Sequence, residues 1–197
     1  MNYKLLITAG ALAFGLGGCG TVPLPPNVST VNGGNAIGSV DFSYQTTSQV
    51  AFSKFKVCVA SNVSSDAVTL TDSAGSFVGP ATGHYYQNGN SQTVQSGQTI
   101  KYIDDEQQVI IAKGNMVTGM VALGLTRNIA RFELQAAIEP SRVKLLFVNI
   151  AQAQENTGSA ANSGFYPVAT TVGAHSQQVY DALQTTADHI KACLGAG

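Results

Sequence analysis

The stretch Arg131–Ile150, RFELQAAIEPSRVKLLFVNI, decides the fold class of this 197-residue chain. Apolar and polar residues alternate from 131 to 139, which predicts a strand with one buried face and one solvated face. The expected buried face holds Phe132, Leu134, Ala136 and Ile138. Pro140 and Ser141 predict a turn. The return from 143 to 150 is apolar enough for a central or well-covered strand, so the sequence predicts a hairpin inside a sheet.

Two further segments extend this predicted sheet. Val40–Tyr44 (VDFSY) alternates apolar and polar residues and is typical of a first strand. Thr99–Lys113 (TIKYIDDEQQVIIAK) contains two short apolar runs on either side of the acidic residues Asp104, Asp105 and Glu106. The simplest interpretation is a second hairpin with an acidic turn.

A helix is predicted from Ser176 to Leu194 at the end of the chain. Its apolar residues recur along one stripe, at Val179, Leu183, Ile190 and Leu194. The sequence Gly195-Ala196-Gly197 then ends the helix.

The sequence does not decide whether the segment 50–63 is a helix or a strand. Helical spacing is seen at Phe52, Phe55, Val59 and Val63, and strand alternation is seen at Phe55, Val57 and Val59. The three valines favour a strand by propensity.

Two polar segments are predicted to be exposed loops. Gln152–Gly164 is rich in Ala, Asn, Gln and Ser, and Ser73–Gly97 is rich in Gly, Ser, Asn and Gln. In the second segment, Phe77, Tyr85 and Tyr86 indicate that part of it packs.

The order of these elements resembles the TBP-like or helix-grip domains of bacterial envelope lipoproteins. The likeness is carried by four segments: SQVAFSKFKVCVASNV, IKYIDDEQQVIIAKG, the hairpin 131–150, and QQVYDALQTTADHIKACL. It implies an α+β fold in which two helices pack on one face of an antiparallel sheet. Two features depart from the pattern, namely the long insertion Ser73–Gly97 and Cys58, where such helices often carry a tryptophan. Many members of this group have no established activity, so the resemblance implies a fold and little chemistry.

The first nineteen residues resemble a bacterial lipoprotein leader. Lys4 precedes an apolar run, Leu5–Phe14, that is too short to span a bilayer. Leu16-Gly17-Gly18-Cys19 then resembles a lipobox. The resemblance implies cleavage before Cys19 and acylation of that residue with fatty acids such as palmitate. Gly20 is not the aspartate that retains such proteins in the inner membrane, which favours the outer membrane, facing the periplasm. The alternative is an ordinary secretory signal peptide in which Cys19 has no such role.

We therefore expect three regions in the chain. Residues 1–18 are a signal peptide, residues 19–38 are a lipidated cysteine and a flexible tether rich in Pro, Gly, Asn, Ser and Thr, and residues 39–197 are a single α+β domain.

Cys58 and Cys193 are an even pair in a chain that is expected to be exported. They predict a disulfide, with two buried reduced thiols as the alternative.

Motifs for other chemistry are missing from the sequence. There is no GxSxG elbow, no CxxC and no HxxxH, and the histidines His84, His175 and His189 lie far apart. We therefore predict no catalytic residues, no metal site and no cofactor. Asp104, Asp105 and Glu106 are expected to be a solvated turn.

The charge pattern argues against a nucleic-acid partner. Only 11% of residues are charged, the signs are mixed, and the formal net charge is −1. The expected function is that of a membrane-anchored, non-catalytic interaction or accessory module of an outer-membrane assembly, with an envelope protein as partner. The alternative is a carrier that holds a lipid or another hydrophobic ligand in a groove between sheet and helices.

Overall fold

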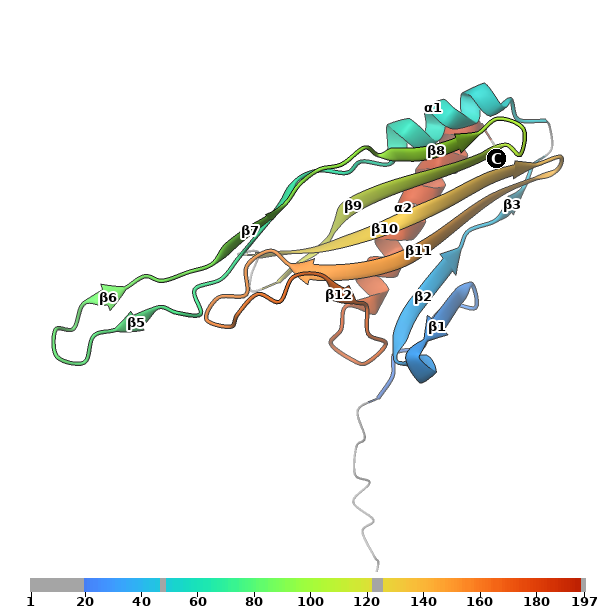
Figure 1. Cartoon of the computed structure of the whole chain (residues 1–197). Coiled ribbons are helices and arrows are strands. Elements are labelled where there is room, and N and C mark those ends of the chain that lie inside the picture. Colours follow the sequence, from blue (N-terminus) through green and yellow to red (C-terminus); the bar gives the residue numbers. More distant parts are fainter. Residues whose placement is uncertain (1–19, 47–48, 122–125, 196–197) are drawn as a thin grey trace, which may run out of the picture.

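The computed structural model describes residues 20–46, 49–121 and 126–195. These residues form a long antiparallel sheet, two helices on one of its faces, and a two-stranded arm that projects from one end (Figure 1). The predicted α+β class is confirmed. The predicted signal peptide and the predicted lipidation site Cys19 lie outside the described residues.

The sheet is built around three long strands. The strand order is β1 (Val28–Val31), β2 (Ala36–Asp41), β11 (Arg142–Gln154), β10 (Thr126–Glu139), β9 (Val109–Val121) and β8 (Ile100–Asp104). Two short strands, β3 (Tyr44–Gln45) and β12 (Tyr166–Pro167), pair with β11. The predicted central hairpin is confirmed and is longer at both ends than the stretch 131–150.

Alternation along β10 and β11 separates the two faces of the sheet. Leu134 lies opposite Phe147 in the register, and both side chains are fully buried. Their neighbours Gln135 and Leu146 point to the opposite face and keep contact with water. We call this second face, which the helices do not cover, the open face.

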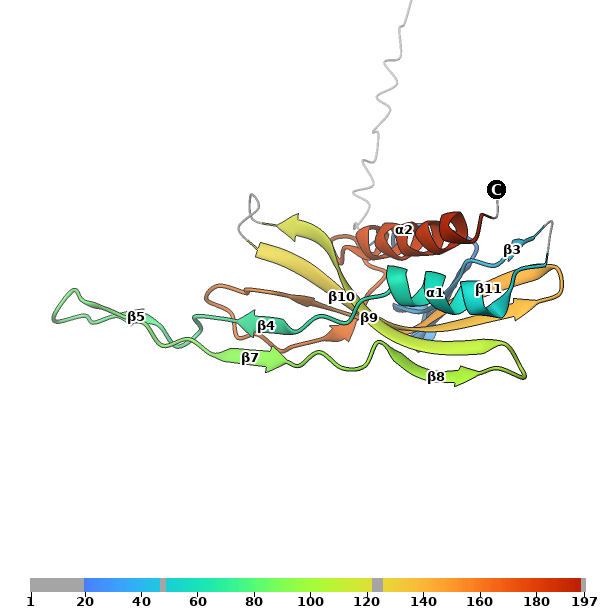
Figure 2. The same ribbon diagram turned by 90° about the horizontal axis from the view of Figure 1, so that it is seen from above.

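The two helices lie together on the buried face, as Figure 2 shows from above. The ambiguous segment is a helix, α1 (Phe52–Asn62), and it buries Phe55, Cys58 and Val59. Burial of this helical face outweighs the strand propensity of the valines, and Val57 is left exposed. The second helix, α2 (Ser176–Leu194), has the predicted bounds and the predicted buried stripe.

The prediction of a flexible tether is wrong for its described residues, 20–38. Strands β1 and β2 begin within that range, and β2 pairs with β11 through Val40 and Phe147. Ala36 and Ile37 are buried, and Leu24 and Val28 pack against the main core, so this Gly-rich segment belongs to the folded domain. The Gly and Asn residues supply the turn between β1 and β2, where Asn32, Gly33 and Gly34 all have positive φ. The domain therefore begins before residue 39.

The segment predicted as a long exposed loop is an ordered arm. In its inner half β4 (Val68–Thr71) pairs with β7 (Ser91–Val94), and in its outer half β5 (Phe77–Val78) pairs with β6 (Tyr85–Tyr86). Figure 1 shows the arm reaching far beyond the sheet. The second predicted loop, 152–164, is partly strand, because β11 continues to Gln154.

A nearly buried carboxylate, Asp72, fastens the root of the arm to the rest of the domain. It accepts hydrogen bonds from the backbone N–H groups of Asn162 (2.9 Å) and Ala74 (3.0 Å) and from Asn90 Nδ2 (3.2 Å). These donors hold the pKa of Asp72 below its ordinary value of 3.8.

We expect this attachment to persist from pH 7 to pH 5 and to weaken only below about pH 4. A carboxylate whose pKa is lowered by folding contributes stability above its unfolded pKa and loses it as the pH falls through the folded value. The amide resonances of Ala74 and Asn162, followed by NMR from pH 7 to pH 2, report this directly. A transition centred above pH 5 would contradict the assignment, and Asp72→Asn serves as the control that abolishes the titration.

Candidate functional site

A hollow of about 800 Å³ lies on the open face, between the root of the arm and the sheet. Its wall on the arm side includes Val68 and Val94, and Phe165 forms another part of the wall. Its sheet side carries the polar residues Lys101, Lys113, Arg131, Glu133 and Asn149. The hollow is therefore a concave site with apolar walls and converging charged groups.

The charges in this hollow are unbalanced. Three cationic side chains, Lys101, Lys113 and Arg131, face one carboxylate, Glu133. The ammonium groups of Lys101 and Lys113 are neighbours in the hollow. The interaction with Lys113, together with partial desolvation, lowers the pKa of Lys101, and Glu133 opposes the shift. An anion placed between the two lysines would relieve the repulsion between their ammonium groups.

The third cation is held by an aromatic ring. The Arg131 guanidinium lies 4.6 Å from the centre of the Phe165 ring. This contact positions the planar group at the wall of the hollow. Its fork of N–H donors suits carboxylate oxygens.

Two irregularities in the strands shape the hollow. Lys101 is the extra residue where the β8–β9 register shifts between Ile100 and Tyr102. Asn149 lies in β11 opposite the break in the register between Arg131 and Glu133, and its φ is 53°. Bulges of this kind redirect side chains, and asparagine tolerates the left-handed conformation better than most residues.

The arm reaches the hollow by passing close to Gly114. A Cβ atom at this position would lie 2.8 Å from Val63 Cγ1 and 2.9 Å from the Ser64 carbonyl oxygen. The neighbouring Asn115 holds the segment that leads into the arm, because its Nδ2 donates a hydrogen bond to the Asp66 carbonyl oxygen at 2.6 Å. Gly114 and Asn115 together fix the wall on the arm side.

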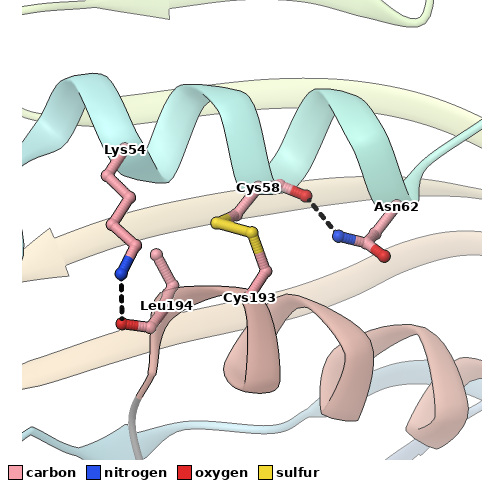
Figure 3. The surroundings of a disulfide bond; sticks show 5 residues. All are labelled: Lys54, Cys58, Asn62, Cys193 and Leu194. Atoms are coloured by element: carbon pink, nitrogen blue, oxygen red, sulfur yellow. Dashed lines mark hydrogen bonds between the residues drawn. A yellow bond between two sulfur atoms is a disulfide. The ribbon is translucent and has the colours of Figure 1, made fainter.

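The cysteines predicted to pair are joined by a disulfide on the helix side of the sheet (Figure 3). The Cα atoms of Cys58 and Cys193 are 5.7 Å apart, and the bond connects α1 to α2. Lys54 Nζ donates to the Leu194 carbonyl oxygen at 2.9 Å beside it. The disulfide is a structural link between the helices and takes no part in the hollow.

The other residues considered from the sequence are not brought together. His84 lies near the tip of the arm, His175 precedes α2 and His189 lies within α2, and all three are exposed. Asp104 closes the turn between β8 and β9 by accepting hydrogen bonds from two backbone N–H groups, and Asp105 pairs with Lys56 at 2.8 Å. Among residues 20–46, 49–121 and 126–195, no three His, Cys, Asp or Glu side chains are placed to hold a metal ion. Within the same ranges, no helix combines the length and apolar character that crossing a membrane requires.

The hollow was not identified from the sequence, although one signal for it is present. In the predicted hairpin Thr99–Lys113, Lys101 lies near the start of the first strand and Lys113 at the end of the second, so both are far from the turn on neighbouring strands. Arg131, Asn149 and Phe165 line the hollow because of the path of the arm and the bulge in β11. The predicted hairpin gives no information on that path or on that bulge.

No family model and no curated protein matches this chain. A solved structure, that of a DUF4468 family protein from Bacteroides ovatus, is similar in fold. The two chains share 11% sequence identity and a TM-score of 0.50, over 87% of this chain and 92% of the other. At this level of identity the likeness concerns the fold alone.

Proposed function

We propose that this chain is a non-catalytic lipoprotein, anchored through Cys19 to the outer membrane and facing the periplasm, that acts as an interaction module of an envelope assembly. The cationic hollow is its binding site, and the ligand is an acidic segment of a partner protein. The observation that carries this proposal is the surplus of two positive charges among Lys101, Lys113, Arg131 and Glu133 in one concave site.

The surroundings of the hollow suit a protein ligand. Beyond the charged groups, the open face continues with half-buried apolar side chains such as Ile111, Leu146 and Val148. A partner segment could thus place a carboxylate between the lysines and rest its apolar groups on the sheet. Interfaces of this kind combine an apolar centre with charges that fix the orientation.

The alternative function, a carrier of a hydrophobic ligand between sheet and helices, receives no support from the packing there. Phe55 of α1, Leu134 of the sheet and Leu183 of α2 belong to the same core cluster, and all three side chains are fully buried. Side chains of the protein itself therefore occupy the space where such a ligand would lie.

The lipid anchor can be tested by the mass of the protein extracted from membranes. We expect a mature chain that begins at Cys19 and carries fatty acyl chains, because two or three such chains are needed for stable anchoring. Cys19→Ala should abolish acylation and release the domain. A Cys19→Ala protein that is still acylated would contradict this part of the proposal.

The hollow can be tested with a short glutamate-rich peptide as probe. Replacing both Lys101 and Lys113 by glutamine should weaken binding by about tenfold or more, because charge-assisted hydrogen bonds are lost. The affinity of the unchanged protein should fall as the salt concentration rises. Isothermal titration calorimetry gives both results.

The matched control removes two lysines elsewhere, as Lys54→Gln with Lys191→Gln, since neither residue lines the hollow. Equal loss of affinity in both double variants would indicate a general charge effect and would refute the assignment of the site.

A further inference from the structure

The tip of the arm presents large apolar side chains to solvent. Phe77 and Val78 on β5 are 55% and 60% exposed, and Tyr85 and Tyr86 on β6 are 61% and 46% exposed. Phe77 and Tyr86 stack on each other with their ring centres 5.0 Å apart. Four such residues on one short hairpin form an exposed apolar patch, and such patches mark interaction surfaces. We call these four residues the aromatic tip.

The aromatic tip belongs to a stretch without formal charge. From Ser73 to Ile100 the sequence contains no Asp, Glu, Lys or Arg, although charged residues bound it at Asp72 and Lys101. In a loop that binds a protein, charged side chains help to orient the partner. In a loop that enters a lipid surface, each charged side chain makes insertion less favourable. The composition therefore favours a lipid surface as the occupant.

The residue types agree with that occupant. Phenylalanine and valine partition into the acyl boundary of a membrane. Tyrosine rings are enriched at the headgroup level, where the ring contacts acyl chains and the hydroxyl stays hydrated. The aromatic tip combines both types on paired strands.

The tip is ordered before any contact is made. The Gly79 N–H donates to the His84 carbonyl oxygen at 2.8 Å, and the Gly83 N–H donates to the Gly79 carbonyl oxygen at 2.9 Å. At the root, Asp72 and Asn162 hold the arm in place. Binding then requires little further ordering of the chain.

The direction of the arm also suits a membrane. In Figure 1 the chain enters the domain at the bottom of the view, below β1 and β2, and the arm slopes downward toward its tip at the left. Gly20 is held to the domain, since its carbonyl oxygen accepts a hydrogen bond from Val172 N–H at 3.0 Å. The proposed anchor at Cys19 directly precedes Gly20, so the anchor and the tip can contact the same surface.

We propose that the aromatic tip inserts into the headgroup region of the membrane that carries the lipid anchor, and so fixes the orientation of the domain on that membrane. This inference rests on the proposed anchoring at Cys19 for the identity of the membrane. Because the tip is uncharged, the insertion is independent of the charge of the lipids. The domain thereby holds its cationic hollow at a defined height above the lipid surface.

The chain contains no tryptophan, so one introduced tryptophan reports on one site. Phe77→Trp is placed in the full mature protein, reconstituted in phosphatidylcholine vesicles with brominated acyl chains. We expect a blue-shifted emission that loses most of its intensity to bromine quenching, and the same result with anionic phosphatidylglycerol vesicles. Tyr102→Trp is the matched control, because Tyr102 is 52% exposed on β8, outside the arm. Its emission should be the same with and without brominated lipid.

Two outcomes would overturn the proposal. The first is that the Phe77→Trp reporter emits like the Tyr102→Trp control and escapes bromine quenching. The second is that it escapes bromine but is also shielded from aqueous acrylamide, which would mean that a protein or a second copy of the chain covers the tip. Intact mass can show that Cys19 carries no lipid. In that case the same vesicles are added to the mature chain without an anchor. Bromine quenching of the Phe77→Trp emission then still shows whether the tip inserts.

Discussion

Replacing both Cys58 and Cys193 by alanine is expected to lower the free energy of unfolding by about 4–5 kcal/mol. The two cysteines are 135 residues apart in the sequence, so the bond removes much of the conformational freedom of the unfolded chain. A domain of this size has a total stability of roughly 5–15 kcal/mol, which makes the loss a large fraction of the whole. Urea unfolding of the two proteins, followed by circular dichroism, measures the difference.

Reductant provides the control for this experiment. It should destabilise the unchanged protein toward the level of the double variant and leave the double variant itself unaffected. A difference below about 1 kcal/mol between the two proteins would contradict a stabilising role for the bond between α1 and α2.

Phe147→Ala is expected to cost about 3–5 kcal/mol, the usual range for removing a fully buried aromatic side chain. Phe147 is fully buried in the central strand β11, and its ring contacts those of Phe132 (5.2 Å between centres) and Phe42 (5.8 Å). The alanine would leave a cavity between the sheet and α2 that neighbouring side chains fill only in part. The unfolding midpoint in urea measures this cost.

Tyr102→Ala is the control for Phe147→Ala, because it also removes a ring from a strand, but one that is 52% exposed. Its effect should stay within about 0.5 kcal/mol. If both substitutions had the same effect, the assignment of Phe147 to the centre of the core would be wrong.

Short-range patterns in the sequence predicted the centre of the fold. The alternation from Arg131 to Ile150 predicted β10 and β11, and the apolar stripe of residues 176–194 predicted α2 with its observed bounds. Both patterns reflect burial against a neighbouring layer, and burial of this kind leaves a period that can be detected in the sequence.

Two parts of the fold depend on contacts that leave no repeating pattern of apolar residues in the sequence. Residues 28–39 form β1 and the start of β2, and the buried apolar side chains there are two adjacent ones, Ala36 and Ile37, which give no alternation. The arm from Val68 to Val94 has a polar composition, and it is ordered by backbone pairing and by Asp72 at its root. Backbone hydrogen bonds do not depend on residue type, so composition alone did not predict these strands.

The candidate site combines both kinds of information. Two of its cations, Lys101 and Lys113, lie on the two strands of a hairpin that the sequence predicts. The third, Arg131, is positioned by Phe165, which lies in a loop that sequence patterns do not place. Nor could the sequence predict that the arm closes the hollow, because this requires Gly114 to let the chain at Ser64 approach the sheet.

Site-specific photo-crosslinking in living cells tests the binding role of the hollow most directly. A photoreactive amino acid is placed at Gln98, which lines the hollow, and in a control strain at Val57, which is 62% exposed on α1 at the opposite side of the sheet. The proposed binding role predicts an adduct with an acidic segment of an envelope protein from position 98 and no such adduct from position 57. The adduct from position 98 should be lost when Lys101→Glu and Lys113→Glu are added. Crosslinking from position 98 that is no stronger than from position 57, or that survives both charge reversals in a folded protein, would contradict this role.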